Sequence, residues 1–253
     1  MGIPLLAWPA AIAIGASLGL LGSGGSILTV PLLVYVLGQD EKVAIAGSLA
    51  VVGTVALVGS LPFLKERLVD GRAVVVFGVP AAAGSWLGSA GSAFVPGYLQ
   101  LALFAVVMLV ASFFMLRPPR LAAAEPRHRA PWRGALDGLG VGALTGMVGV
   151  GGGFLIVPAL VLQGGLPMRR AIGTSLMLIA IQAGVGFVQH LRLLHAASLS
   201  LDWPLLGLIT TLAIVGSLVG TRLAVRLSQL QLRRVFGVFL IGMGIYILVR
   251  SLH

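Results

Sequence analysis

The sequence has no cysteine and very little charge. Only 9% of its 253 residues are Asp, Glu, Lys or Arg, against about 25% in an ordinary soluble domain. The missing cysteines exclude disulfide bonds and thiolate metal sites. The missing charge excludes a soluble globular domain of this length, because such a domain needs charged side chains over its whole surface.

In place of charge, the chain has apolar residues, which make up 58% of it, and 36 glycines. This hydrophobicity excludes intrinsic disorder and predicts an all-α polytopic membrane protein, whose apolar helices cross the bilayer. At about 20 residues per span, plus loops, the chain has room for about 8–10 membrane segments. Two apolar runs, residues 26–37 and 154–163, are too short to cross as helices, and each follows a cluster of glycines.

The formal net charge of +10 raises the question of nucleic-acid binding. Of the 17 Lys and Arg residues, 16 stand between apolar runs or at their ends, where basic loops record membrane orientation. We therefore expect no nucleic-acid partner. Residues 1–6 carry no Lys or Arg, whereas a cleaved secretory signal begins with a basic region, so the first apolar segment is expected to stay in the protein.

The two halves of the chain match each other. Gly22–Pro31 aligns with Gly149–Pro158 at an offset of 127 residues, and the same offset places Ile45–Leu49 on Ile172–Leu176 without a gap. Further along, an offset of 132 joins two small-xxx-small patterns, at residues 84–89 and 216–221, which predict close helix packing. These matches predict a single integral membrane domain made of a first repeat (1–116), a cytoplasmic linker (117–133) and a second repeat (134–253).

The placement of the basic residues predicts the direction of the repeats. If each glycine cluster forms a broken helix or hairpin, each half crosses an odd number of times. The repeats are then inverted, and 14 of the 17 basic residues lie on one side. If each cluster is a mere kink, the repeats are parallel and the division becomes 10 and 7. Because basic loops collect in the cytoplasm, the sequence favours inverted repeats with both termini outside.

A short helix that follows a glycine cluster suggests an anion site. A helix N-terminus has unpaired N–H groups and a partial positive charge, and glycine lets a ligand approach them. In inverted repeats the two clusters meet near the midplane, where polar residues of the following spans add ligands. The predicted substrate-binding residues are Ser23, Gly24, Gly25, Ser26 and Ser48 in the first half and Gly151, Gly152, Gly153, Thr174, Ser175 and Gln182 in the second. For each Gly or Ser taken alone, helix packing is the alternative role.

Few side chains suggest catalysis or ion coupling. No predicted span has an Asp, Glu or Lys near its middle. Asp137 is expected near the cytoplasmic interface, and His190 and His195 near an external span end. Without a metal-ligand cluster, paired carboxylates or a phosphate-binding loop, we expect no enzyme activity, no metal and no cofactor. A coupling proton or sodium ion stays open, as does a homodimer.

The doubled motif Gly-x-Gly-Gly-(Gly/Ser)-x-Leu-x-Val-Pro, at residues 22–31 and 149–158, resembles the TauE/SafE family of membrane proteins. The Ala46-Gly47-Ser48 and Gly173-Thr174-Ser175 positions are similar to that family too, and the resemblance extends from about residue 13 to residue 249. The family is associated with export of sulfite and of sulfonates such as sulfoacetate. The resemblance therefore implies a small oxyanion as the substrate.

These observations predict a secondary transporter that exports a small anion, sulfite or an organosulfonate. It would work by alternating access around a midplane site between two glycine-rich helix N-termini. The motifs differ at Ser23 against Val150 and at Ser26 against Gly153, which predicts unequal half-sites. The expected partners are a small anionic solute and the lipid bilayer. Two alternatives stay open: an anion channel, and a membrane assembly or lipid-handling protein that moves no solute.

Overall fold

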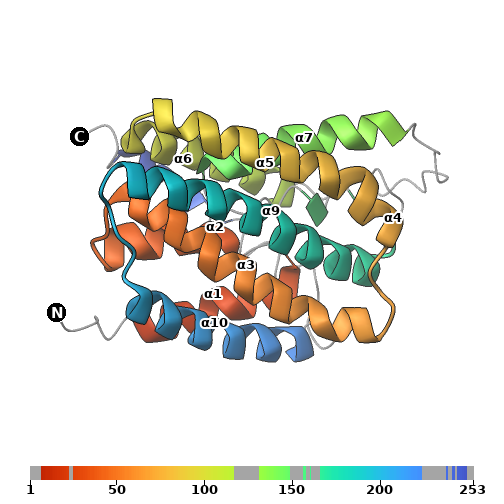
Figure 1. Ribbon diagram of the computed structural model, residues 1–253. Coiled ribbons are helices and arrows are strands. Elements are labelled where there is room, and N and C mark those ends of the chain that lie inside the picture. The colour runs from red at the N-terminus through yellow and green to blue at the C-terminus, as the bar shows by residue number, and fades with distance from the viewer. Residues whose placement is uncertain are drawn as a thin grey trace.

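The computed structural model of the protein is an assembly of helices (Figure 1). It describes residues 7–22, 25–116, 131–148, 156–157, 160, 166–223, 238, 241–242 and 244–249. Over these residues every regular element is helical, as expected for an all-α membrane protein.

The first half begins with α1 (Ala7–Leu21), a glycine turn and the short α2 (Ser26–Pro31), which continues as a π-helical segment over Leu32–Val36. The long α3 (Glu41–Lys65) follows. Then come α4 (Gly71–Ala73), a second π-helical segment (Val74–Gly78), α5 (Val79–Gly91), a 3-10 turn (Ser92–Phe94) and α6 (Gly97–Leu116). The second half contributes α7 (Pro131–Val148), α9 (Met168–Ala196) and α10 (Trp203–Leu223). The short apolar run predicted at residues 26–37 is thus an 11-residue helical segment, whereas most of residues 154–163 lies outside the described residues.

Local signals explain where these helices begin. Asp40 precedes α3, and its carboxylate accepts a hydrogen bond of 2.9 Å from the backbone N–H of Lys42. Asp70 caps α4 in the same way, through the N–H of Ala73 at 2.8 Å. An N-terminal acidic side chain of this kind satisfies an otherwise unpaired amide and complements the helix dipole. The few acidic residues of the chain are therefore used largely at helix starts.

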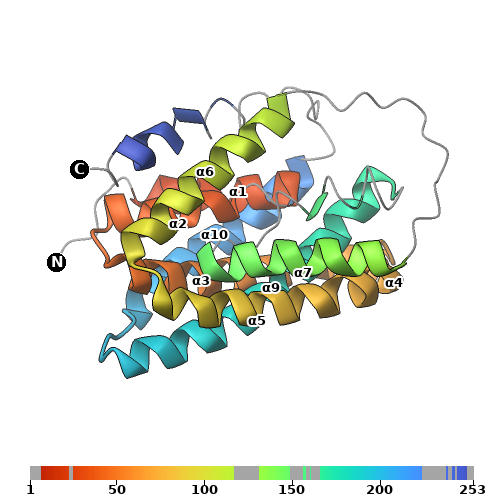
Figure 2. The same ribbon diagram turned by 90° about the horizontal axis from the view of Figure 1, so that it is seen from above.

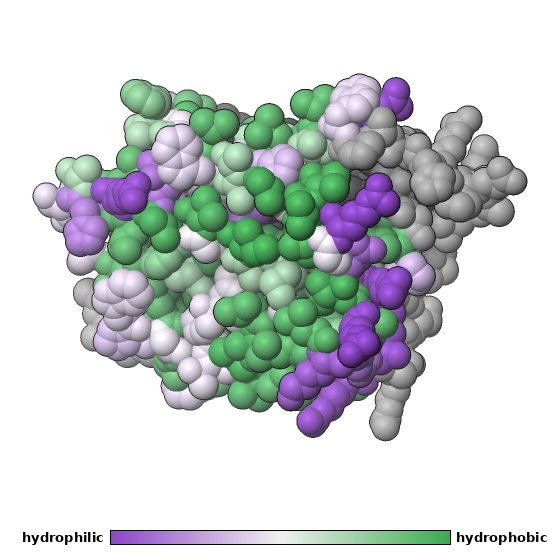
Figure 3. Space-filling view, turned by 45° about the vertical axis from the view of Figure 1, so that its right-hand side comes forward, coloured by the Kyte–Doolittle hydropathy of each residue, from purple (hydrophilic) through white to green (hydrophobic). Residues whose placement is uncertain are grey.

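Four helical stretches of the described chain are long and apolar enough to cross a membrane: Glu41–Lys65, Gly71–Phe94, Arg169–Ala196 and Trp203–Leu223. Shorter apolar helices cover Trp8–Leu20 and Gly97–Val110. Large apolar side chains such as Val75, Val79 and Phe94 point outward. Figure 3 shows apolar residues across the middle of one face, with the most hydrophilic residues toward its two sides. This surface suits lipid as the surrounding solvent.

The helices pack in three pairs: α1 against α10, α3 against α9 and α5 against α7. Figure 1 shows α3 and α9 between the other two pairs, and Figure 2 shows the same helices from above. In the first pair, residue 15 meets residue 213 and residue 19 meets residue 217; residues 12 and 16 likewise meet residues 216 and 220. The contact positions rise together along both helices, so α1 and α10 run parallel. In the central pair, Gly53 contacts Ala183, Gly59 contacts Leu176 and Gly173 contacts Phe63, so α3 and α9 run antiparallel.

Direction and contact divide the six helices of these three pairs into two triads. The first triad is α1, α3 and α10, and the second is α7, α9 and α5. All three helices of a triad run the same way, and α3 and α9 form the interface between the triads. Each triad takes two helices from one half of the chain and one from the other. At the offsets of 127 and 132 residues, α1 corresponds to α7, α3 to α9 and α10 to α5, so the two triads are made of equivalent elements.

Glycine lets the backbones of the outer pairs touch. A Cβ placed on these glycines would overlap backbone atoms of the facing helix, and the contacts fall at equivalent positions of the two halves. In the first pair Gly15 faces Ala213, Gly19 faces Ser217, Gly216 faces Ile12 and Gly220 faces Ala16; in the second pair Gly142 faces Ala81, Gly146 faces Ser85, Gly84 faces Leu139 and Gly88 faces Ala143. Within a membrane such small-residue contacts are a main source of helix association. The small-xxx-small patterns are therefore packing sites.

The described charges lie at the two ends of the helices and differ in number. We call one end the basic end; it carries the cations Lys65, Arg67, Arg72, Arg133, Arg169, Arg170 and Arg222. The opposite end carries Lys42 and Arg192. At the basic end Arg169 pairs with Glu66 at 2.8 Å, and both side chains are more than half exposed.

Replacing Gly142 with Val tests the backbone contact of α7 with α5. We expect Gly142→Val to lower the unfolding temperature strongly, because its Cβ overlaps the carbonyl oxygen of Ala81 and overpacking of this kind costs about 1–3 kcal/mol or more. The matched control is Gly140→Val, two residues away on the exposed side of the same helix, where a Cβ meets nothing within 4 Å. Thermal unfolding of both purified variants in detergent provides the measurement. Equal stability of the two variants would contradict the packing argument.

Candidate functional site

Gly22 and Gly25, from the first glycine cluster, lie between α1 and α2. Gly22 adopts a φ of +68°, a left-handed conformation that favours glycine. Gly25 is the N-cap of α2, and a Cβ there would overlap the carbonyl oxygen of Ile14 in α1. Backbone conformation at Gly22 and close approach at Gly25 thus explain both glycines. The predicted site residues Ser23 and Gly24 lie outside the described residues.

Gly22 meets the other half of the chain at Ser175. The Ser175 hydroxyl lies 2.9 Å from the carbonyl oxygen of Gly22 and 2.8 Å from that of Ile172, one turn earlier in α9. A Cβ on Gly22 would lie 2.9 Å from the Ile172 side chain. The structure therefore brings together Gly22, from the first repeated motif, and Ser175, which follows the second motif. Their hydrogen bond joins the two triads.

Three more predicted site residues, Ser26, Ser48 and Thr174, are buried. The hydroxyl of Ser48 donates to the carbonyl oxygen of Ile45 at 2.7 Å, which is the same local contact that Ser175 makes with Ile172. Thr174 Oγ1 accepts a hydrogen bond of 2.9 Å from the backbone N–H of Asp70. Thr174 thus ties the α3–α4 loop to α9 near the basic end. The second glycine cluster, Gly151, Gly152 and Gly153, lies outside the described residues.

Gln182 is buried at the middle of α9 and has an unused donor. Its Oε1 accepts a hydrogen bond from Thr145 of α7 at 3.3 Å, and its main-chain oxygen accepts one from Ser85 of α5 at 2.9 Å. Its Nε2 has no hydrogen-bond partner among the described residues. A buried donor without an acceptor costs about 1–3 kcal/mol, so a ligand that accepts from it would recover that free energy.

The surroundings of Gln182 belong to one triad. Gln182, Thr145 and Ser85 come from α9, α7 and α5, which together form the second triad. In the first triad the positions equivalent to Gln182 and Thr145 hold Val55 and Leu18. The two sides of the α3–α9 interface are therefore chemically unequal, as the differences between the repeated motifs also predict.

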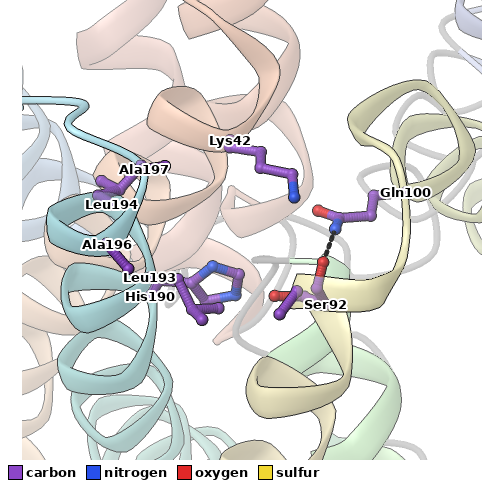
Figure 4. A pocket seen from close by; sticks show the side chains of 9 residues that line it. Lys42, Ser92, Gln100, His190, Leu193, Leu194, Ala196 and Ala197 are labelled. Atoms are coloured by element: carbon purple, nitrogen blue, oxygen red, sulfur yellow. Dashed lines mark hydrogen bonds between the residues drawn. The ribbon is translucent and has the colours of Figure 1, made fainter.

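A cavity of about 250 Å³ lies at the end opposite the basic end. Figure 4 shows the side chains of Lys42, His190 and Ser92 directed toward a common space, with Gln100 on its far side. The cavity is lined from α3, α9, α6 and the 3-10 turn, by Lys42, Ser92, Ala93, Gln100, His190, Leu193, Leu194, Ala196 and Ala197.

Hydrogen bonds fix the polar side chains of this cavity. Gln100 Nε2 donates to the carbonyl oxygens of Ser92 at 2.8 Å and Val95 at 2.9 Å, and Gln100 Oε1 is buried without a donor among the described residues. His190 Nε2 lies 2.8 Å from the carbonyl oxygen of Gly146. Because a carbonyl oxygen only accepts, Nε2 carries the proton of that bond.

The sequence alone did not reveal this cavity. It predicted a position near an external span end for His190 but gave that residue no partner. The one signal present was the place of Lys42, three residues before the repeated stretch Ile45–Leu49 and equivalent to Arg169 in the other half. Neither fact shows that α6 and the 3-10 turn cover this side of Lys42.

Comparison with known proteins identifies the family. The family described as sulfite exporter TauE/SafE matches residues 7–247. A "Probable membrane transporter protein" of Xylella fastidiosa is 35% identical over 245 residues, which are 94% of this chain and 92% of that protein. The chain belongs to the TauE/SafE family.

Other relatives of this TauE/SafE protein carry the same kind of name. The "Probable membrane transporter protein YunE" of Bacillus subtilis is 27% identical over 197 residues, covering 68% of this chain and 72% of its own length. A "Probable membrane transporter protein" of Methanocaldococcus jannaschii is 23% identical over 261 residues, 97% of each chain. No solved structure matches. The family and these names agree with the apolar helices: the protein is a membrane transporter.

Changing Gln182 to Leu tests whether this side chain serves transport although its Nε2, which has no acceptor among the described residues, lowers stability. We expect Gln182→Leu to keep or raise the unfolding temperature, because it removes a buried unpaired donor, and at the same time to lower transport at least tenfold. Thr54→Val is the control, since Thr54 lies at the same level of α3 but is exposed and bonds within its own helix to Ala50 at 2.8 Å. Thermal unfolding and solute flux are measured on the same preparations. Full transport by a stable Gln182→Leu protein would remove Gln182 from the site.

Proposed function

We propose that this protein is a secondary transporter that exports a small anion, sulfite or an organosulfonate, by alternating access. The observation that carries the proposal is the contact of Gly22 with Ser175 across the two triads. Seven residues further along α9, the Nε2 of Gln182 has no partner among the described residues. Glycine turns and uncharged donors bind anions without a buried cation. The description of the family, sulfite exporter, supports the choice of anion.

The packing supports a rocking mechanism. Inside each outer pair the backbones touch through glycines, so α1 with α10 and α7 with α5 are expected to move as units. Between the triads, α3 packs on α9 with more room at Gly59, where an added Cβ would lie 3.7 Å from the Leu176 side chain and overlap no backbone atom of α9. In transporters built from repeats, one unit rocks against the other around a fixed site. The α3–α9 interface and the Gly22–Ser175 bond are where we expect the rearrangement.

The membrane potential supports the direction. With the inside negative, an anion that leaves the cell moves downhill by about 2.3 kcal/mol per charge for each 100 mV. Export of a small anion therefore needs no further energy source. A coupling proton or sodium ion would modify this gradient and is not required by it.

We also propose that the two repeats are inverted and that the basic end faces the cytoplasm of a bacterial inner membrane. The antiparallel packing of α3 and α9, which are equivalent elements, supports inversion. The excess of cations at the basic end supports the orientation, because basic loops stay in the cytoplasm. Both chain termini would then be external, with residues 1–116 and 134–253 as the repeats.

Flux measurements test the transport proposal. Purified protein in liposomes loaded with labelled sulfite is expected to release it much faster than protein-free liposomes. The double variant Gly24→Leu and Gly151→Leu is expected to lose this flux, since it fills both predicted glycine tips. Gly140→Leu and Gly207→Leu are matched controls at exposed glycines with open space around them. Full flux through the correctly folded double variant would refute the site, and conductance far above a carrier's turnover would indicate a channel.

Cysteine labelling tests the topology, and the absence of native cysteine makes it clean. Gly71→Cys lies at the basic end and Ser200→Cys in the α9–α10 loop at the other end, both exposed. In intact cells a membrane-impermeant maleimide is expected to label Ser200→Cys and to reach Gly71→Cys only after lysis. The reverse labelling pattern would overturn the orientation, and equal labelling of both in intact cells would overturn the placement of these loops on opposite sides.

A further inference from the structure

We propose that the cavity around Lys42, His190 and Gln100 is a second anion site, which takes a small singly charged oxyanion that carries a hydroxyl group, such as hydrogensulfite. The proposal rests on the anion export proposed above. It adds a site at the end opposite the basic end, where the exported anion would leave. It stands on the geometry of the cavity and on a comparison of the two ends of the molecule.

The two ends hold equivalent cations in different surroundings. Lys42 and Arg169 are the second residues of α3 and α9 and correspond at the offset of 127. Arg169 is neutralised by Glu66 at 2.8 Å. The position equivalent to Glu66 is Leu193, which lines the cavity beside Lys42. The same place in the fold thus provides a carboxylate at the basic end and an apolar side chain at the other.

No carboxylate neutralises Lys42 among the described residues. Asp40 accepts the backbone N–H of Lys42 at 2.9 Å and so caps α3. Glu41 lies against Gly97 at the start of α6. The ammonium group of Lys42 makes no ion pair in the described part of the chain, and it points into the cavity (Figure 4). A partly buried cation that lacks an ion-pair partner attracts an anion.

Two acceptors complete the cavity and make it selective. Gln100 Oε1 is an acceptor because its Nε2 already donates to two carbonyl oxygens, and it has no donor among the described residues. The contact with Gly146 places a proton on Nε2 of His190, so in the uncharged form of the ring Nδ1 is the second acceptor. A bare oxyanion would meet Lys42 but repel these acceptors. An oxyanion with one hydroxyl satisfies the cation with its charged oxygens and an acceptor with its O–H.

The size and place of the cavity fit this role. A volume of about 250 Å³ accommodates an oxyanion of four or five heavy atoms together with some of its water. Through His190 the cavity is hydrogen-bonded to Gly146, whose carbonyl oxygen also accepts from Ser89 at 3.0 Å. Gly146 lies in the last turn of α7, directly before the second glycine cluster. The cavity thus lies where an anion that leaves the midplane would next find a counter-charge.

Calorimetric titration of the full-length protein in nanodiscs with sodium hydrogensulfite at about pH 6 tests this site. We expect Lys42→Gln to weaken binding at the cavity about tenfold or more, since it removes a charged donor. Leu193→Glu is expected to do the same while keeping Lys42, because it places a carboxylate where Glu66 stands beside Arg169. The matched control Arg169→Gln, at the equivalent cation, is expected to change the affinity less than twofold. Methanesulfonate, equal in charge but without a hydroxyl, is expected to bind about tenfold more weakly than hydrogensulfite.

The outcomes separate this proposal from the transport proposal. Unchanged binding in folded Lys42→Gln and Leu193→Glu proteins would overturn the second site even if the wild-type protein exports sulfite. Equal affinity for methanesulfonate would overturn the role of Gln100 and His190 as acceptors. Lys42-dependent binding in a protein that moves no sulfite through liposomes would support the site and refute the proposed transport. Retained Lys42-dependent binding in the Gly24→Leu and Gly151→Leu variant would support two distinct sites.

Discussion

Direct backbone contact through glycine is the constraint on which the rest of the structure depends. Lipid is as apolar as the side chains, so burial of apolar surface does not drive these helices together, and close contact must do so. In α1 with α10 and α7 with α5, glycine alternates between the two partners, and a Cβ at these positions would overlap the facing backbone. The result is two tightly bound outer pairs on either side of α3 and α9. In the proposed rocking mechanism, that division lets one triad move against the other.

The sequence allowed much of this to be predicted, but not which helices pair. The match at an offset of 127 residues and the two small-xxx-small patterns predict equivalent halves with close-packed faces. The bounds of α1 and α7 and of α3 and α9 agree with that offset. A small-xxx-small pattern does not identify its partner, however. The glycines of residues 84–88 face α7 and those of 216–220 face α1, so each pair joins one half to the other. Such exchange depends on the path of the whole chain, and no local pattern of residues records it.

At the candidate site too, the sequence predicted some of the residues but not their contacts. Repeated motifs led to Gly22 and Ser175, and the structure joins them by a hydrogen bond of 2.9 Å. Thr174 belongs to the same motif but bonds to the α3–α4 loop, because neighbouring residues of a helix point about 100° apart. The cavity at Lys42 was invisible for a different reason. Its walls come from four separate elements, and its proposed chemistry depends on Lys42 having no ion-pair partner among the described residues.

In the proposed inverted arrangement, the equivalence of the two triads has an energetic consequence. Exchanging the triads leaves nearly the same set of backbone contacts, so inward-facing and outward-facing states built from them would differ little in backbone packing. The free-energy difference between the states must then come from side chains that are not equivalent. Near the middle of the helices, Gln182 is polar where the equivalent Val55 is apolar. At the helix ends, Glu66 pairs with Arg169 where the equivalent Leu193 is apolar. Under this proposal, a scaffold with matched halves makes both states accessible, and a few unmatched residues bias which state is favoured and which anion binds.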